Sequence, residues 1–193
     1  MKDLALLIPR VVLGGLLAGH GAQKLFGAFG GYGLKGTAGW LESIGLRPGD
    51  RWAMLAGLGE FGGGVLTLLG LGGAVGPITA MAPMAMAAGT VHAGKPIWVT
   101  SGGPELPITN LAIAAAIAVG GPGRYSLDHA FGIEVPRAVT ALALGATVAG
   151  VGVGLATASA YSKQQAVEKP HAVEAGAELE GGKEAAGPGG HES

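Results

Sequence analysis

The chain contains no cysteine and little charge. Without cysteine it cannot form disulfides, thiolate metal sites, iron–sulfur clusters or a covalent c-type haem, and it has no cysteine nucleophile. Asp, Glu, Lys and Arg make up 13% of its residues, whereas an ordinary soluble domain has about a quarter. The formal net charge of −1 gives no basic surface for nucleic acid, so we expect no nucleic-acid partner.

Glycine and apolar residues fill the composition instead. Glycine occupies 39 of 193 positions and hydrophobic residues make up 49% of the chain. No three-residue repeat accompanies the glycines, which excludes a collagen-like fibre. Membrane helices tolerate glycine because small residues let neighbouring backbones approach each other in lipid. The sequence therefore favours a membrane protein, with small-residue pairs such as Gly15/Gly19, Gly59/Gly63 and Gly150/Gly154 as helix contacts.

Five apolar stretches are long enough, or nearly long enough, to cross a bilayer as helices of about 20 residues. They are residues 4–27, 52–71, 74–93, 105–121 and 136–160. A signal peptide is the alternative for the first stretch, but Pro9 and Arg10 interrupt it and no suitable cleavage site follows. We predict an all-α fold, a polytopic membrane helix bundle inserted as a multi-pass protein in the bilayer.

The remaining segments differ from these stretches. Residues 37–45 place Thr37, Trp40, Leu41 and Ile44 at helical spacing, which predicts a short amphipathic helix at the membrane interface. Residues 161–193 contain three Lys against six Glu and show no apolar period. We predict that this acidic tail is disordered.

Charged and titratable side chains inside the apolar stretches are the candidate site residues, because each costs several kcal/mol in lipid unless it faces protein or water. They are Arg10, His20, Lys24, Glu60 and His92, which we predict to form an intramembrane polar cluster. Counting along the helices at about 1.5 Å per residue puts His20 and Glu60 at similar depth. Glu60 needs a cationic partner or a proton, and the sequence leaves both His20 and Lys24 open as that partner.

The predicted topology gathers the long connections at one end of the bundle. Residues 28–51 and 94–106 both emerge where the first helix finishes, and we call this the loop end; the opposite end is the N-terminal end. Cation counts in the short loops favour a cytoplasmic loop end.

Several segments together resemble the DoxX family of small bacterial membrane proteins. These are Arg10, His20-Gly-Ala-Gln-Lys-Leu-Phe-Gly27, Gly36-Thr-Ala-Gly-Trp40, Glu60, His92 and Gly102-Gly-Pro-Glu-Leu106. The resemblance covers about residues 4–127 and implies four membrane helices. It predicts a DoxX-like domain over 1–128, an additional transmembrane helix over 129–160 and the tail over 161–193. It also implies a cytoplasmic N-terminus, which opposes the cation count, so both orientations stay open.

The family takes its name from a subunit of a thiosulfate:quinone oxidoreductase. The resemblance thus implies an integral membrane subunit associated with an oxidoreductase or redox-stress complex in the bacterial cell membrane. With no cysteine and no metal cage, electron transfer would use a quinone or a partner's cofactor. The expected partners are lipid, redox enzyme subunits and further copies of the chain. A small-solute transporter or channel and a scaffold that docks a soluble enzyme are the alternatives.

Overall fold

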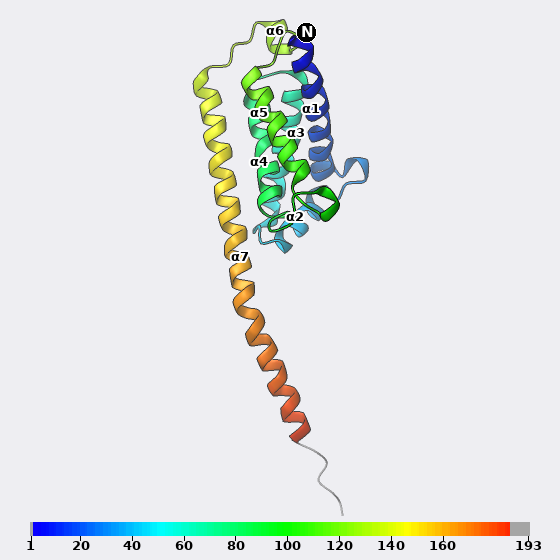
Figure 1. Cartoon of the computed structure of the whole chain (residues 1–193), viewed down its shortest axis with the longest axis vertical. Helices are drawn as coiled ribbons and strands as arrows, with labels where there is room; N and C mark the ends of the chain where they lie inside the picture. Colours follow the sequence, from blue (N-terminus) through cyan, green and yellow to red (C-terminus); the bar gives the residue numbers. More distant parts are fainter. Residues whose placement is uncertain (1, 186–193) are drawn as a thin grey trace, which may run out of the picture.

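The computed structural model describes residues 2–185, which form a bundle of α-helices with no strand among them (Figure 1). In chain order the elements are α1 (Lys2–Phe26), η1 (Ala28–Gly30), α2 (Gly33–Ser43), α3 (Gly49–Leu69), α4 (Val75–Gly89), η2 (Val99–Ser101), α5 (Glu105–Gly120), α6 (Leu127–Phe131) and α7 (Arg137–Ala185). The predicted all-α bundle is confirmed. Each apolar stretch overlaps one helix of the bundle, α2 covers residues 37–43 of the predicted amphipathic segment 37–45, and the short α6 was not predicted.

The five helices differ in length. Three segments are long and apolar enough to cross a membrane, namely Asp3–Phe26, Gly49–Leu69 and Arg137–Val167. The other two apolar helices, α4 and α5, have 15 and 16 residues. At about 1.5 Å per residue they are 22–24 Å long, which is shorter than a hydrocarbon core of about 30 Å. Of the five predicted spans, three are therefore candidate spans by length and composition and two are shorter apolar helices; α4 ends in a turn after Gly89, before the apolar stretch 74–93 does.

The interior of the bundle is built where α1, α4 and α5 meet. Leu13 and Leu17 of α1 are buried against Ala80 and Met84 of α4, and Ile117 of α5 belongs to the same cluster. A second cluster lies at the loop end and joins α2, α3, α4 and α7 around Leu41, Leu46, Ala53, Trp52, Met86 and Ala158. The bundle therefore has one core along its length and a smaller one under the loops.

Backbone contact at glycine holds α1 against α3. A Cβ atom added at Gly21 would lie 2.2 Å from the backbone nitrogen of Phe61, and one added at Gly64 would lie 2.4 Å from the backbone nitrogen of Ala18. The predicted Gly15/Gly19 contact is wrong, because a Cβ at either position would have no described atom within 4 Å. The packed face of α1 is set by its buried leucines, and the Gly15/Gly19 pair lies on another face.

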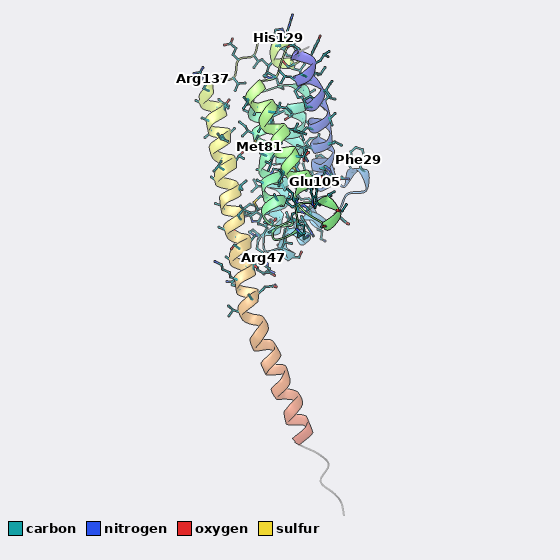
Figure 2. All side chains as sticks on the ribbon, viewed as in Figure 1. Phe29, Arg47, Met81, Glu105, His129 and Arg137 are labelled. Carbon is teal, nitrogen blue, oxygen red and sulfur yellow. The ribbon has the colours of Figure 1, made fainter. Side chains whose placement is uncertain are left out.

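The last helix, α7, packs chiefly on α4. Near the loop end the ring centroid of Tyr161 lies 4.7 Å from the guanidinium carbon of Arg47. Figure 2 shows Arg47 beside α7 at this end and Arg137 at the opposite end of the bundle.

Beyond Tyr161, α7 continues to Ala185 and extends past the bundle (Figure 1). This differs from the disorder predicted for residues 161–193. Ala, Glu, Lys and Gln dominate this segment and are good helix formers, so a composition too polar to build a core still forms a helix. Residues 186–193 lie outside the described residues.

Candidate functional site

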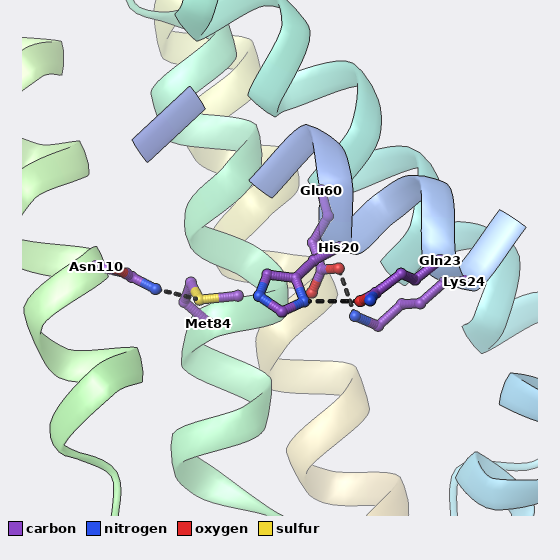
Figure 3. A network of polar contacts seen from close by, with 6 residues as sticks. All are labelled: His20, Gln23, Lys24, Glu60, Met84 and Asn110. Atoms are coloured by element: carbon purple, nitrogen blue, oxygen red, sulfur yellow. Dashed lines mark hydrogen bonds and ion pairs between the residues drawn. The ribbon is translucent and has the colours of Figure 1, made fainter. Parts of the chain in front are cut away.

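Lys24 and Glu60 form an ion pair between α1 and α3 (Figure 3). The Nζ atom of Lys24 donates a hydrogen bond to Oε2 of Glu60. The side chain of Glu60 is 5% exposed and that of Lys24 is 25% exposed. A carboxylate at this depth would cost several kcal/mol without a cationic partner. Of the two partners that the sequence left open for Glu60, the structure selects Lys24.

His20 lies apart from this pair. Its Nδ1 atom is 3.1 Å from Oε1 of Gln23 on the same helix, and the contact is exposed. Side chains on a helix lean toward its N-terminus, so the long side chain of Lys24 reaches back to the level of Glu60. The shorter imidazole of His20 leans further toward the N-terminal end and is turned outward. The predicted similar depth of His20 and Glu60 therefore does not produce a contact.

Arg10 lies at the N-terminal end of the bundle, far along α1 from Lys24. Its side chain is buried, with 2% of the residue exposed. Nη1 donates to the carbonyl oxygen of Pro122, and Nη2 donates to the carbonyl oxygen of Tyr125. A Cβ added at Gly70 would lie 2.6 Å from Nη1, so the guanidinium also packs directly on the end of α3. Arg10 thus fastens α1 to the segment after α5.

Asp128 joins the same segment to the turn between α3 and α4. Its two carboxylate oxygens accept the backbone N–H groups of Gly72 and Gly73 at 2.9 and 2.6 Å. Its own backbone N–H donates to the carbonyl oxygen of Gly70 at 3.1 Å. Together, Arg10 and Asp128 close the N-terminal end of the bundle. The sequence analysis missed Asp128, because an acidic residue outside the apolar stretches looks like an ordinary surface charge.

His92 lies just beyond the end of α4. Its Nδ1 atom donates to the carbonyl oxygen of Gly102 at 2.6 Å, which ties the loop between α4 and α5 to the turn after α4. The five predicted site residues therefore do not form a single cluster. Only Lys24 and Glu60 contact each other, while Arg10, His20 and His92 each bind nearby groups of their own. The described residues contain no group of side chains that could hold a metal ion.

An apolar pocket of about 440 Å³ lies beside the ion pair. Residues of α3, α4 and α7 line it, together with Lys24 of α1 and residues of α2 and the turn that follows α2. The lining residues on which the argument depends are Lys24, Trp40, Trp52, Leu55, Leu58, Glu60, Thr79, Thr90, Ala143, Ala146, Thr147, Gly150 and Val151. This size lies within the range typical of small-molecule sites.

The hydroxyl groups in this pocket are already engaged. Thr79 and Thr90 each donate to a carbonyl oxygen one turn back on α4, at 2.7 Å. Thr147 of α7 lies 3.4 Å from the carbonyl oxygen of Ile78 and donates to it. Lys24 and Glu60 therefore supply the charged atoms of a pocket whose other walls are mostly apolar.

The family comparison covers this site. The DoxX family model matches residues 5–93. These residues form a DoxX domain. DoxX is a membrane family, so the chain is a membrane protein whose apolar helices contact lipid. No curated protein and no solved structure matches the chain.

The matched residues include Lys24, Glu60 and the parts of α2, α3 and α4 that line the pocket. The α5, α6 and α7 helices lie outside the match, although the sequence resemblance was drawn to about residue 127. The DoxX domain thus supplies the ion pair and most of the pocket, and α7 supplies the remaining wall.

Proposed function

We propose that this DoxX-domain protein is a membrane subunit of an oxidoreductase or redox-stress assembly in the bacterial cell membrane, and that its pocket holds a molecule of the quinone class. The observation that carries the proposal is an apolar cavity of about 440 Å³ with a single ion pair in its wall. A quinone has the matching chemistry, since it combines an apolar ring and tail with two polar oxygens. An isoprenoid tail could leave the pocket toward lipid past the exposed Leu55 and Leu58.

The side chains around the pocket fit the two oxidation states of such a ring. The ammonium group of Lys24 can donate to a ring carbonyl. Oε2 of Glu60 accepts from Lys24, whereas Oε1 has no hydrogen-bond partner among the described residues, which leaves it to accept from a ring hydroxyl. Trp40 and Trp52 offer flat apolar surfaces for a ring to pack on. The chain binds and orients the ring in this account, and a partner enzyme exchanges the electrons.

A solute passage along α1 has less support. The charged residues of that helix lie at opposite ends, and the Nη1 and Nη2 atoms of Arg10 at the N-terminal end each donate to a carbonyl oxygen. Between them, the glycine contacts at Gly21 and Gly64 bring the backbones of α1 and α3 together and leave no room for a solute.

The test is to isolate the protein from its native membrane in mild detergent and measure extracted quinone and co-isolating dehydrogenase subunits. We expect both with the wild-type chain. Glu60→Gln should retain about a tenth of the quinone, because a hydrogen bond to a charged group contributes about 1.5–3 kcal/mol. Asp50→Asn is the matched control, since Asp50 is an exposed carboxylate in the first turn of the same helix.

Other outcomes would favour the alternatives. Dehydrogenase without quinone would support a scaffold. Solute flux into liposomes by the protein alone, with no quinone bound, would overturn the proposal in favour of a transporter.

A further inference from the structure

We infer that α7 determines which ring size the pocket accepts, with Ala146 and Gly150 as the specificity-determining residues. The inference rests on the proposed function, because it concerns the ligand of the same pocket. It goes beyond the DoxX domain, since α7 lies outside the matched residues 5–93. Five residues of α7 line the pocket, and they are Ala143, Ala146, Thr147, Gly150 and Val151.

The positions of these residues place them on one face of the helix. They follow the spacing i, i+3, i+4, i+7 and i+8, which is a single stripe along an α-helix. A Cβ added at Gly150 would have no described atom within 4 Å. One turn further on, a Cβ added at Gly154 would lie 2.6 Å from Cε of Met86 and 3.1 Å from the ring of Trp52. The open space of the pocket therefore reaches Gly150 and ends before Gly154.

The register of α7 against α3 places this face opposite the ion pair. Gly154 lies opposite Trp52, and Glu60 is two turns further along α3. The two helices run in opposite directions, so the residue of α7 level with Glu60 is eight positions before Gly154, at Ala146. Gly150 then lies between the levels of Glu60 and Trp52. These two small residues face the part of the pocket in which a ring would contact the ion pair.

The helix cannot easily move away to make room for a larger side chain. Toward the N-terminal end of the pocket, the hydroxyl of Thr147 donates a hydrogen bond to the carbonyl oxygen of Ile78 on α4. Toward the loop end, Gly154 packs on Met86, and the ring of Tyr161 lies against the guanidinium of Arg47. A larger side chain at 146 or 150 therefore takes space from the ligand. The small residues of α7 make the pocket wide enough for a fused two-ring head, and larger ones would restrict it to a single ring.

The experiment compares a methyl-naphthoquinone with a methyl-benzoquinone as probes, using the full chain in nanodiscs. Trp98→Phe provides the background, because the chain has three tryptophans and the other two line the pocket. Binding is read as quenching of Trp40 and Trp52. In Ala146→Leu and Gly150→Leu we expect naphthoquinone affinity to fall roughly tenfold more than benzoquinone affinity, since filling a pocket by a few methylene groups commonly changes discrimination by that factor.

Gly152→Leu is the control, because a Cβ at Gly152 also meets no described atom within 4 Å and its position is about 200° around the helix from Gly150. It should bind both probes as the wild type does. Equal losses for the two probes, or no loss in either Leu variant, would overturn the inference while leaving the proposed function in place. Failure of the wild-type chain to bind either probe would overturn both. Two pocket variants are used so that misfolding of one, detected by thermal unfolding, leaves the other to decide.

Discussion

At Glu60 the protein keeps a carboxylate away from water and balances it with a single lysine. The pair is asymmetric, because Glu60 is almost fully buried whereas Lys24 keeps a quarter of its side chain exposed. Removing Lys24 therefore leaves a buried charge, while removing Glu60 leaves a lysine that can turn toward the loop end. We expect the first change to destabilise the protein more than the second.

A double-mutant cycle on Lys24→Gln and Glu60→Gln tests this pairing. The double variant should lose less free energy of unfolding than the sum of the two single variants, with a coupling of about 1 kcal/mol or more. His20→Gln combined with Glu60→Gln is the control and should be additive, because His20 bonds to Gln23 instead. Thermal or denaturant unfolding in detergent measures the wild type, the three single variants and the two double variants. Coupling at His20 and additivity at Lys24 would contradict the structure.

The sequence alone identified only some of the residues of this site and of their contacts. It identified Glu60 as a carboxylate in need of a partner, because an acidic residue in an apolar stretch is conspicuous. It could not choose between His20 and Lys24, since the choice depends on side-chain length and lean. It grouped Arg10 with them because all three are charged or titratable side chains of the first apolar stretch, and the distance along α1 separates their roles. Asp128 had no signal in hydropathy, since its burial comes from the turn it binds.

At the scale of elements, α1 and α3 make the most extensive helix contact in the bundle. The two backbones touch at Gly21 and Gly64, where any side chain would collide with backbone atoms of the other helix. Dispersion contacts of this kind are the main attraction between helices in lipid, because lipid tails are as apolar as the side chains. The ion pair Lys24–Glu60 joins the same two helices and depends on their separation.

Gly21→Ala should therefore destabilise the bundle by about 1–3 kcal/mol, since the added methyl group forces the helices apart. Gly15→Ala is the matched control on the same helix, where a Cβ would meet no described atom within 4 Å. It should leave stability unchanged or raise it slightly, because alanine has the higher helix propensity. Unfolding temperatures in the same detergent compare the two variants. A larger loss for Gly15→Ala would place the helix contact on the other face of α1.

The helices themselves follow from the sequence, because a long apolar run has few alternatives to a helix in a membrane. The lengths of the helices, and the faces on which they pack, do not follow from it. The apolar run that contains α4 continues for several residues beyond Gly89, where the chain turns instead. The GxxxG spacing of Gly15 and Gly19 predicted a contact, and the contact lies at glycines with a different spacing. Which face packs depends on all neighbours at once, so a local motif cannot decide it.

At the scale of the whole molecule, a DoxX domain is combined with a helix that continues far past it. The bundle holds α7 as far as Tyr161, through Gly154, Ala158 and the Arg47 contact. Residues 162–185 then extend beyond the bundle as part of the same helix (Figure 1).

Truncation after Tyr161 should leave the unfolding temperature nearly unchanged, because the contacts that hold α7 to the bundle remain. Truncation after Thr157 is the comparison and should lower it by several degrees, since it also removes Ala158 and the Tyr161 ring from the loop end. Differential scanning measurements on the purified proteins in one detergent distinguish the two. A large drop in the unfolding temperature after truncation at Tyr161 would show that the C-terminal extension docks on the bundle.

The tie made by Arg10 and Asp128 has a consequence for motion. It joins α1, the α3–α4 turn and the segment after α5 at the N-terminal end with charged groups that donate to or accept from backbone. The loop end is held by packing, by the contact of Arg47 with the Tyr161 ring and by exposed hydrogen bonds such as that from His92 to Gly102, which open more readily than buried charged groups do. Slow fluctuations should therefore be concentrated at the loop end, with the N-terminal end as a fixed pivot.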